Sequence, residues 1–280
     1  MRWLSFSADG RSSFGYLEED YVVDLGAVCN LPDLKSALSL KCLAFLSQVL
    51  CDRAPRISLQ DIEFLPPIPN PSKVLCVGLN YLEHQKETGH GGEDYPTIFV
   101  RFGEAQIGHN GEMLRPQESA SLDFEGEIAM VIGSRGRRIP KDECLDHIFG
   151  FSCYNDGSVR DYQRHTSQFT PGKNFAQTGG FGPWIMTTEE ISDLANMELS
   201  THLNGELMQH ARSSDMVFDF ATILSYCSTF IELEPGDVIV TGTPGGVGSR
   251  RDPPVFLNDG DVISVSVRPI GTLTNTVSLG

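Results

Sequence analysis

The sequence lacks long apolar runs, clusters of basic residues and a recognisable leader. None of its apolar runs approaches the roughly 20 residues that a membrane-spanning helix needs, and Met1 to Phe6 lacks the apolar core of a signal peptide. Lys and Arg occur at most in pairs, and the formal net charge is -16. Such an acidic chain is a poor ligand for nucleic acid or an anionic membrane. We therefore expect a cytoplasmic protein that binds neither.

Cysteine is present but lacks the spacing of a disulfide framework or a zinc site. The chain has 7 cysteines, an odd number, and no Cys-x-x-Cys. Several lie inside apolar runs, which is typical of reduced core residues in a cytosolic protein.

Nucleotide-binding and serine-hydrolase motifs are also absent. The segment from Thr241 to Gly248 is rich in glycine and follows an apolar strand, but it contains neither Gly-x-x-x-x-Gly-Lys nor Gly-x-Gly-x-x-Gly. No Gly-x-Ser-x-Gly nucleophile elbow occurs anywhere. The segment better fits a tight turn that presents Thr243 to a ligand, or a plain loop.

The apolar patterning predicts an α+β fold that is mostly β. Short alternating runs over residues 1–27 predict an antiparallel meander, and Asp33 is a plausible N-cap for a helix that reaches about residue 51. Four prolines between 66 and 71 predict a domain boundary. We expect a small N-terminal α/β extension over residues 1–65, and a larger domain over 66–280 built from a mixed, largely antiparallel sheet.

In the larger domain, local patterns predict individual elements. Asn204-Gly205 is the favoured turn of a β-hairpin, and Asp219 is the N-cap of an amphipathic helix. The stretch from Gly172 to Pro183 is rich in glycine and predicts irregular chain.

Three carboxylates form a candidate metal site. Leu122 to Ile132 has the pattern of a strand, so Glu125 and Glu127, two residues apart, share a face. Asp156 follows a second apolar strand that starts at Ile148. Three acids in one place are costly without a cation, and oxygen ligands favour Mg²⁺, Mn²⁺ or Ca²⁺ over Zn²⁺. A solvated strand face or a structural acid network are the alternatives.

A histidine and a lysine add candidate catalytic groups. His84 and Glu87 are three residues apart, so on a helix Glu87 could orient the imidazole as a base, although a surface ion pair has the same spacing. Lys173 lies in a constrained turn where a cation could hold a substrate carboxylate, although most lysines are simply solvated.

Taken together, these segments resemble the fumarylacetoacetate hydrolase superfamily over about residues 66–280. The segments that carry the resemblance, in the family's order, are Val77 to Glu87, Leu122 to Gly133, Asn155 to Asp161, Gly172 to Phe175, Gly182 to Trp184, and Leu233 to Gly248. The resemblance implies a β-roll or β-sandwich catalytic domain of mixed strands and a homodimer.

The resemblance also implies roles for individual residues. It implies Mg²⁺ or Mn²⁺, with Ca²⁺ as a possible substitute, held by Glu125, Glu127 and Asp156. His84 and Glu87 match the family's water-activating pair, and Lys173 matches its substrate-polarising lysine. The residues that match polar substrate contacts are Arg101, Arg160, Gln163 and Thr243. The chain departs from many acylpyruvate-cleaving members at Leu79, where they have arginine, and Arg101 stands where many have lysine.

The implied activity has two forms. The first is hydrolysis of a carbon–carbon bond in an acylpyruvate-like or fumarylpyruvate-like β-diketo acid by a metal-dependent enzyme. The alternative, on the same site, is decarboxylation or tautomerisation of a 2-oxo acid of the oxaloacetate or hydroxymuconate type. All of these pass through an enolate of a small anionic 2-oxo acid. A non-catalytic binding protein is a third hypothesis, disfavoured by the complete set of ligands, base and lysine.

Overall fold

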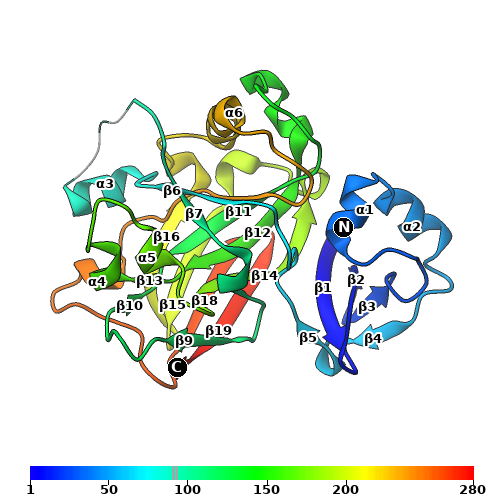
Figure 1. Ribbon diagram of the computed structural model, residues 1–280, viewed down its shortest axis with the longest axis horizontal. Coiled ribbons are helices and arrows are strands. Elements are labelled where there is room, and N and C mark those ends of the chain that lie inside the picture. Colours follow the sequence, from blue (N-terminus) through cyan, green and yellow to red (C-terminus); the bar gives the residue numbers. More distant parts are fainter. Residues whose placement is uncertain (90–91, 93) are drawn as a thin grey trace.

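The structure is a computed structural model that describes residues 1–89, 92 and 94–280. Within these residues the protein is mostly β, as the patterning predicts, with short helices around the strands (Figure 1). No helix in the described residues is long and apolar enough to cross a membrane.

A 12-stranded mixed sheet runs through the molecule in the order β4-β3-β2-β1-β14-β12-β11-β17-β6-β7, with β5 beside β1 and β8 beside β14. Its N-terminal strands are β1 (Arg2–Ala8), β2 (Arg11–Glu18), β3 (Tyr21–Asp24), β4 (Arg56–Ser58) and β5 (Glu63–Phe64). The remaining strands are β6 (Val74–Gly78), β7 (Thr97–Arg101), β8 (Gln106–Ile107), β11 (Gly126–Ile132), β12 (Ile148–Asp156), β14 (Gly179–Thr187) and β17 (Val238–Val240).

Two smaller sheets complete the strand framework. A 5-stranded sheet has the order β16-β15-β18-β19-β9, and a 2-stranded sheet pairs β10 with β13. Their strands are β9 (Glu112–Arg115), β10 (Leu122–Asp123), β13 (Ser158–Val159), β15 (Glu198–Leu203), β16 (Glu206–Arg212), β18 (Val262–Arg268) and β19 (Gly271–Leu279). The predicted turn at Asn204-Gly205 joins β15 to β16, and both residues have the positive φ that this turn requires.

The N-terminal extension is joined to the rest of the molecule through the backbone of β1. Strand β1 pairs with β14, with Trp3 opposite Ile185. Trp3 and Leu34 share one buried apolar cluster with Ile185 and Val238 from the main body. The prediction of one helix over 33–51 is wrong, because Lys41 has φ 52° and divides it into α1 (Leu34–Ser39) and α2 (Leu43–Val49). Asp33 does cap α1, accepting a hydrogen bond from Ser36 N.

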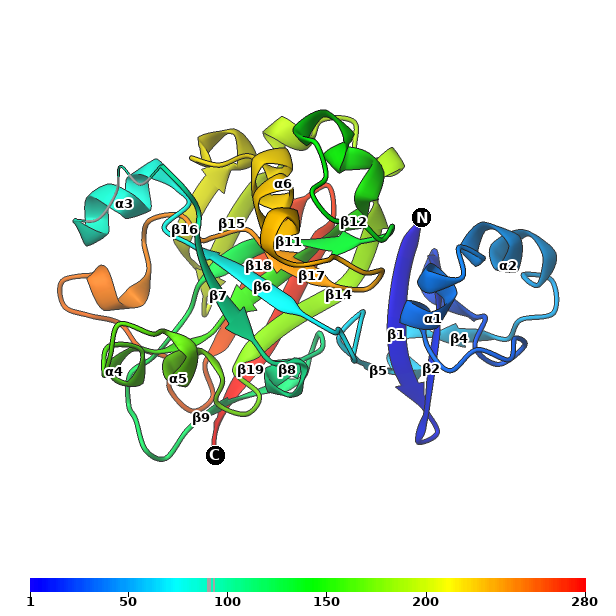
Figure 2. The same ribbon diagram turned by 45° about the horizontal axis from the view of Figure 1, so that its top comes forward.

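The register of the central strands brings the predicted site residues together. In the antiparallel pair β11–β12, Gly126 lies opposite Asn155, so the chain just before β11 meets the end of β12. In the parallel pair β17–β6, Val240 lies opposite Cys76. The ends of β6, β12 and β17 and the start of β11 therefore lie at the same end of the sheet (Figure 2).

The other helices surround this end of the sheet or pack on its face. They are α3 (Leu82–Thr88), α4 (Arg160–Gln163), α5 (Thr170–Lys173) and α6 (Phe220–Phe230). Asp219 caps α6 as predicted, accepting from Thr222 N. Asn80, just before α3, is fully buried, and its Nδ2 donates to Thr241 O at 2.7 Å. This bond ties the start of α3 to the chain that follows β17.

Two predicted elements need correction. The strand expected from Leu122 to Ile132 is divided into β10 and β11, with Phe124 and Glu125 between them. Of the irregular chain expected from Gly172 to Pro183, residues 174–178 are irregular as predicted, whereas Gly172 and Lys173 end α5 and β14 begins at Gly179. Glycines fit there because β14 is covered closely on both sides: a Cβ on Gly180 would lie 2.7 Å from Asn275 Oδ1, and one on Gly179 would overlap Gln106 Oε1.

Candidate active site

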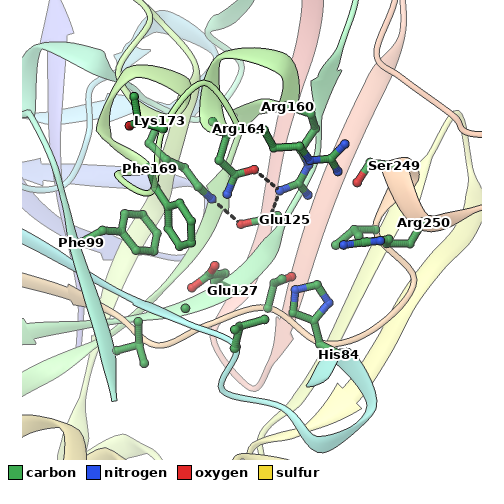
Figure 3. A pocket seen from close by; sticks show the side chains of 17 residues that line it. His84, Phe99, Glu125, Glu127, Arg160, Arg164, Phe169, Lys173, Ser249 and Arg250 are labelled. Atoms are coloured by element: carbon green, nitrogen blue, oxygen red, sulfur yellow. Dashed lines mark hydrogen bonds and ion pairs between the residues drawn. The ribbon is translucent and has the colours of Figure 1, made fainter. Parts of the chain in front are cut away.

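A cavity of about 340 Å³ opens at the end of the sheet where β6 and β17 end and β11 begins. Its lining includes the two predicted glutamates, Glu125 and Glu127, with His84 from α3 (Figure 3). Phe99 and Phe169 form an apolar wall on one side. This volume lies in the range of about 300–1,000 Å³ that is usual for small-molecule sites.

The three predicted carboxylates converge at the inner part of this region. Oxygen atoms of Glu125, Glu127 and Asp156 all lie within 4.8 Å of one another, and the three residues are buried. Gly126 permits the arrangement, since a Cβ there would overlap Thr201 Oγ1 of β15. The two glutamates lie on one face, as strand alternation predicts, and the backbone N–H of Asp156 donates to Glu125 O at 2.8 Å.

Three buried cations surround the carboxylates. Lys173 Nζ lies 2.6 Å from Glu125 Oε2 and 2.7 Å from Asp156 Oδ2. Arg160 contacts the other oxygen of Glu125 through Nη1 at 2.6 Å, and its Nε donates to Asp123 Oδ2 at 2.7 Å. Arg101 donates to Asp156 Oδ1. Asp123 is thus a supporting residue, which also accepts from Gly248 N and Ser249 N.

These surroundings shift the pKa values of the two glutamates in opposite directions. Burial alone would raise the pKa of Glu125, but the charges of Lys173 and Arg160 outweigh it and lower the pKa to about 2. Burial raises the pKa of Glu127 well above its usual range, and the negative charges of Asp156 and Glu125 add to the effect. Glu127 accepts from Gly242 N but has no cationic partner in the described residues. Among the described residues it is the one carboxylate of the three that forms no ion pair.

The donor set fits a hard divalent cation. All three candidate ligands offer carboxylate oxygens, which Mg²⁺ and Mn²⁺ prefer, and no cysteine or histidine belongs to the group. A cation among these oxygens would supply the positive charge that Glu127 lacks.

The predicted His84–Glu87 pair forms on α3. His84 Nδ1 lies 3.0 Å from Glu87 Oε2, and the histidine is only 7% exposed. Glu87 Oε1 accepts from Gly246 N at 3.2 Å. Burial would raise the pKa of Glu87, but its hydrogen bonds to His84 and Gly246 lower it. Glu87 is therefore an ionised carboxylate that fixes one ring nitrogen of His84, while the His84 side chain lines the cavity.

Three of the four residues predicted to contact the substrate line the cavity, and the fourth does not. Arg160, Gln163 and Thr243 line the cavity. The Thr243 hydroxyl, however, donates to Gly126 O at 2.9 Å, and Gln163 Oε1 accepts from Arg160 Nη1 at 2.9 Å. Arg101 does not belong to the lining. It is 2% exposed and lies behind Asp156, where it also donates to Gly157 O and to Thr178 Oγ1.

Sequence reasoning missed several residues of the site. Gln209, in β16, is 2% exposed: its Oε1 accepts from Gly126 N, and its Nε2 donates to Thr243 Oγ1 at 2.8 Å. No local pattern marks it, because its role depends on β16 lying against β11. Arg164, Ser249 and Arg250 also line the cavity. The sequence indicated these three residues only by their position: Arg164 directly follows Gln163, and Ser249 and Arg250 directly follow the Thr241–Gly248 segment.

Comparisons with known proteins identify the family of the chain. Residues 73–278 match the family model described as fumarylacetoacetate (FAA) hydrolase, C-terminal. The chain is 37% identical over 237 residues to the mitochondrial oxaloacetate tautomerase FAHD2B of Bos taurus, a match covering 84% of this chain and 76% of that protein. It is 39% identical over 225 residues to the oxaloacetate tautomerase YisK of Bacillus subtilis, covering 79% and 74%.

Two solved structures extend the comparison to the whole chain. A fumarylacetoacetate hydrolase from psychrophilic Exiguobacterium antarcticum has a TM-score of 0.89 at 37% identity, with 100% of both chains covered. A maleylpyruvate hydrolase from Sphingobium sp. SYK-6, in complex with manganese(II) and pyruvate, has a TM-score of 0.84 at 27% identity, again with 100% of both chains covered. The chain belongs to the fumarylacetoacetate hydrolase superfamily, a family of enzymes.

Proposed function

We propose that this protein is a metal-dependent tautomerase that interconverts the enol and keto forms of oxaloacetate or a closely related 2-oxo acid. The observation that carries the proposal is a carboxylate-oriented imidazole, His84, facing the same cavity as the carboxylates Glu125 and Glu127. The names of the two relatives support this activity above carbon–carbon hydrolysis, which was the first expectation from the sequence.

The metal ligands and His84 have separate roles in the proposed reaction. Mg²⁺ or Mn²⁺ held by Glu125, Glu127 and Asp156 would place positive charge beside the oxygens of the 2-oxo acid, where negative charge develops. His84 takes the proton from C3 of the keto form. The C–H electron pair then becomes the C2–C3 double bond, and the proton returns to the C2 oxygen to give the enol.

The surrounding groups keep His84 and the carboxylates in position. Glu87 holds the ring nitrogen of His84 that faces away from the reaction and stabilises the imidazolium formed when the other nitrogen takes the proton. Lys173 and Arg160 hold both oxygens of Glu125 in place.

A second candidate is hydrolysis of an acylpyruvate. It is favoured by the similarity to the maleylpyruvate hydrolase structure and by the intact His84–Glu87 pair, which could activate water. Decarboxylation of oxaloacetate would pass through the same enolate and is the third outcome to test.

Product mass separates these activities. The purified protein, with Mg²⁺ or Mn²⁺, is given enol oxaloacetate and an acylpyruvate, and loss of the enol is followed by its ultraviolet absorbance. Tautomerisation leaves the mass unchanged, hydrolysis adds water and yields two acids, and decarboxylation removes CO₂. Buffer with the same metal is the control. An enol–keto rate no greater than in that control, with either metal, would refute the proposal.

A further inference from the structure

Two arginines at the mouth of the cavity were not part of the expected site. Arg164 follows the last residue of α4, and Arg250 ends the 3-10 helix Gly248–Arg250. Both line the cavity and both are exposed. In Figure 3, Arg164 is labelled beside Arg160, and Arg250 lies between Ser249 and His84.

These two arginines differ from the other cations of the cavity in forming no ion pair with a carboxylate of the described residues. Lys173 and Arg160 are each paired with carboxylates. Among the ion pairs of the described residues, neither Arg164 nor Arg250 takes part. The neighbouring Arg251 shows the contrast, since its guanidinium donates to Met208 O at 2.8 Å and so supports the loop.

The positive charges at the mouth also repel one another. Burial lowers the pKa of Arg164, and the nearby charges of Arg160 and Arg250 lower it further. An anion bound between the two guanidinium groups would relieve this repulsion. Arginine suits the purpose, because its planar fork of donors matches a carboxylate.

The cavity therefore has two chemically different ends. The inner end holds the carboxylates Glu125 and Glu127, which require a cation, and the mouth holds unpaired positive charge. Phe99 and Phe169 line the wall and offer an apolar surface to a carbon chain. A ligand that matches both ends carries a metal-chelating head and a second, distant anionic group.

We propose that Arg164 and Arg250 form an anion subsite that binds the far carboxylate of a dicarboxylate substrate, and so select 2-oxo diacids over 2-oxo monoacids. The identity of the head group rests on the proposed function. The subsite itself rests on the two unpaired guanidinium groups that line the cavity.

The test compares oxaloacetate with its 4-methyl ester, which has the same carbon chain but lacks the far charge. Tautomerisation of both enols is measured for wild type, Arg164→Gln, Arg250→Gln and the double variant. Loss of a charge-assisted hydrogen bond weakens binding by roughly tenfold or more. The selectivity for the diacid, as the ratio of kcat/KM values, should fall about tenfold for each arginine, mainly through KM.

A matched control removes an arginine elsewhere. Arg53, after α2, is exposed and does not belong to the cavity lining, so Arg53→Gln changes net charge equally and should leave the selectivity as in wild type. A selectivity that stays within about twofold of wild type in the double variant overturns the proposal. So does an equal loss of activity toward both substrates, which would indicate a purely structural role.

Failure of the proposed function gives a different result. If wild type tautomerises neither compound, binding of the two keto acids to Mn²⁺-loaded protein is measured by calorimetry. Tighter binding of the diacid by wild type, lost in the double variant, supports the subsite without any turnover. Equal affinity of wild type for the two compounds contradicts it.

Discussion

Replacement of Lys173 by methionine tests the electrostatic description of the site. Lys173 is 1% exposed, and its ammonium group contacts Glu125 and Asp156 at 2.6 and 2.7 Å. Four buried carboxylates, including Asp123, surround three buried cations, so the fully ionised cluster has one negative charge in excess. Lys173→Met raises that excess to two while keeping most of the apolar volume of the side chain.

The metal-free variant should be much less stable than wild type. Removing one partner of a buried ion pair leaves a charge without compensation and typically costs about 3–5 kcal/mol. In a chain of this size 1 kcal/mol corresponds to roughly 2–4 °C in Tm, so we expect Tm in chelator to fall by roughly 6–20 °C. Mn²⁺ should restore part of this loss, because a divalent cation among the same carboxylates replaces the missing charge.

The measurement is thermal unfolding of both proteins in chelator and in saturating Mn²⁺. The expected signature is a Tm increase with Mn²⁺ that is larger in Lys173→Met than in wild type. Lys73→Met is the matched control, since Lys73 Nζ lies 2.8 Å from buried Asp237 in an ion pair outside the site. The Tm of Lys73→Met in chelator should be lower than that of wild type, but Mn²⁺ should raise the Tm of both proteins by the same amount. A metal-free Lys173→Met protein within about 1 kcal/mol of wild type would refute the reasoning.

The remaining predictions concern ligands, base and pH. Glu125→Gln and Asp156→Asn should each abolish Mn²⁺ binding and activity together, and calorimetry showing undiminished affinity would remove them from the ligand set. His84→Gln should keep Mn²⁺ affinity near wild type while lowering kcat by about 10²–10⁴-fold, and a wild-type kcat would exclude His84 as the base. Burial lowers the pKa of His109 from 6.5 to about 4, so the unfolded chain binds the proton more readily. The contribution of this residue to the free energy of unfolding is greatest above pH 6.5. It decreases by about 2–3 kcal/mol as the pH falls toward 4. Denaturant unfolding of His109→Gln should therefore show a flatter pH dependence over that range than wild type, and an unchanged slope would contradict the assignment.

Residues set by local periodicity were predictable from the sequence. Glu125 and Glu127 line the same cavity, as the alternation of a strand predicts, although Glu125 lies just before β11. Asn204-Gly205 forms a hairpin because few other dipeptides adopt positive φ twice. The spacing of His84 and Glu87 on a helix likewise gives the observed contact.

Features set by tertiary contact were not predictable in this way. Nothing near Gln209 in sequence indicates that its amide meets Gly126 and Thr243, since that contact depends on how β16 lies against β11. The helix over 33–51 was predicted as continuous because its apolar period persists through the break, where Lys41 adopts a positive φ. Arg101 was expected to contact the substrate, but it lies behind Asp156. The pattern of a strand predicts the face on which a side chain lies, but not how deeply that side chain is buried.

The pairing of β1 with β14 has a consequence for the sheet as a whole. Without residues 1–65, the backbone of β14 around Ile185 and Met186 would become an open sheet edge, and the apolar surface that Trp3 covers would face solvent. Exposed edges of this kind are templates for pairing with other chains and for aggregation. Residues 1–65 thus cover this edge of the sheet, and none of them is among the residues that line the cavity.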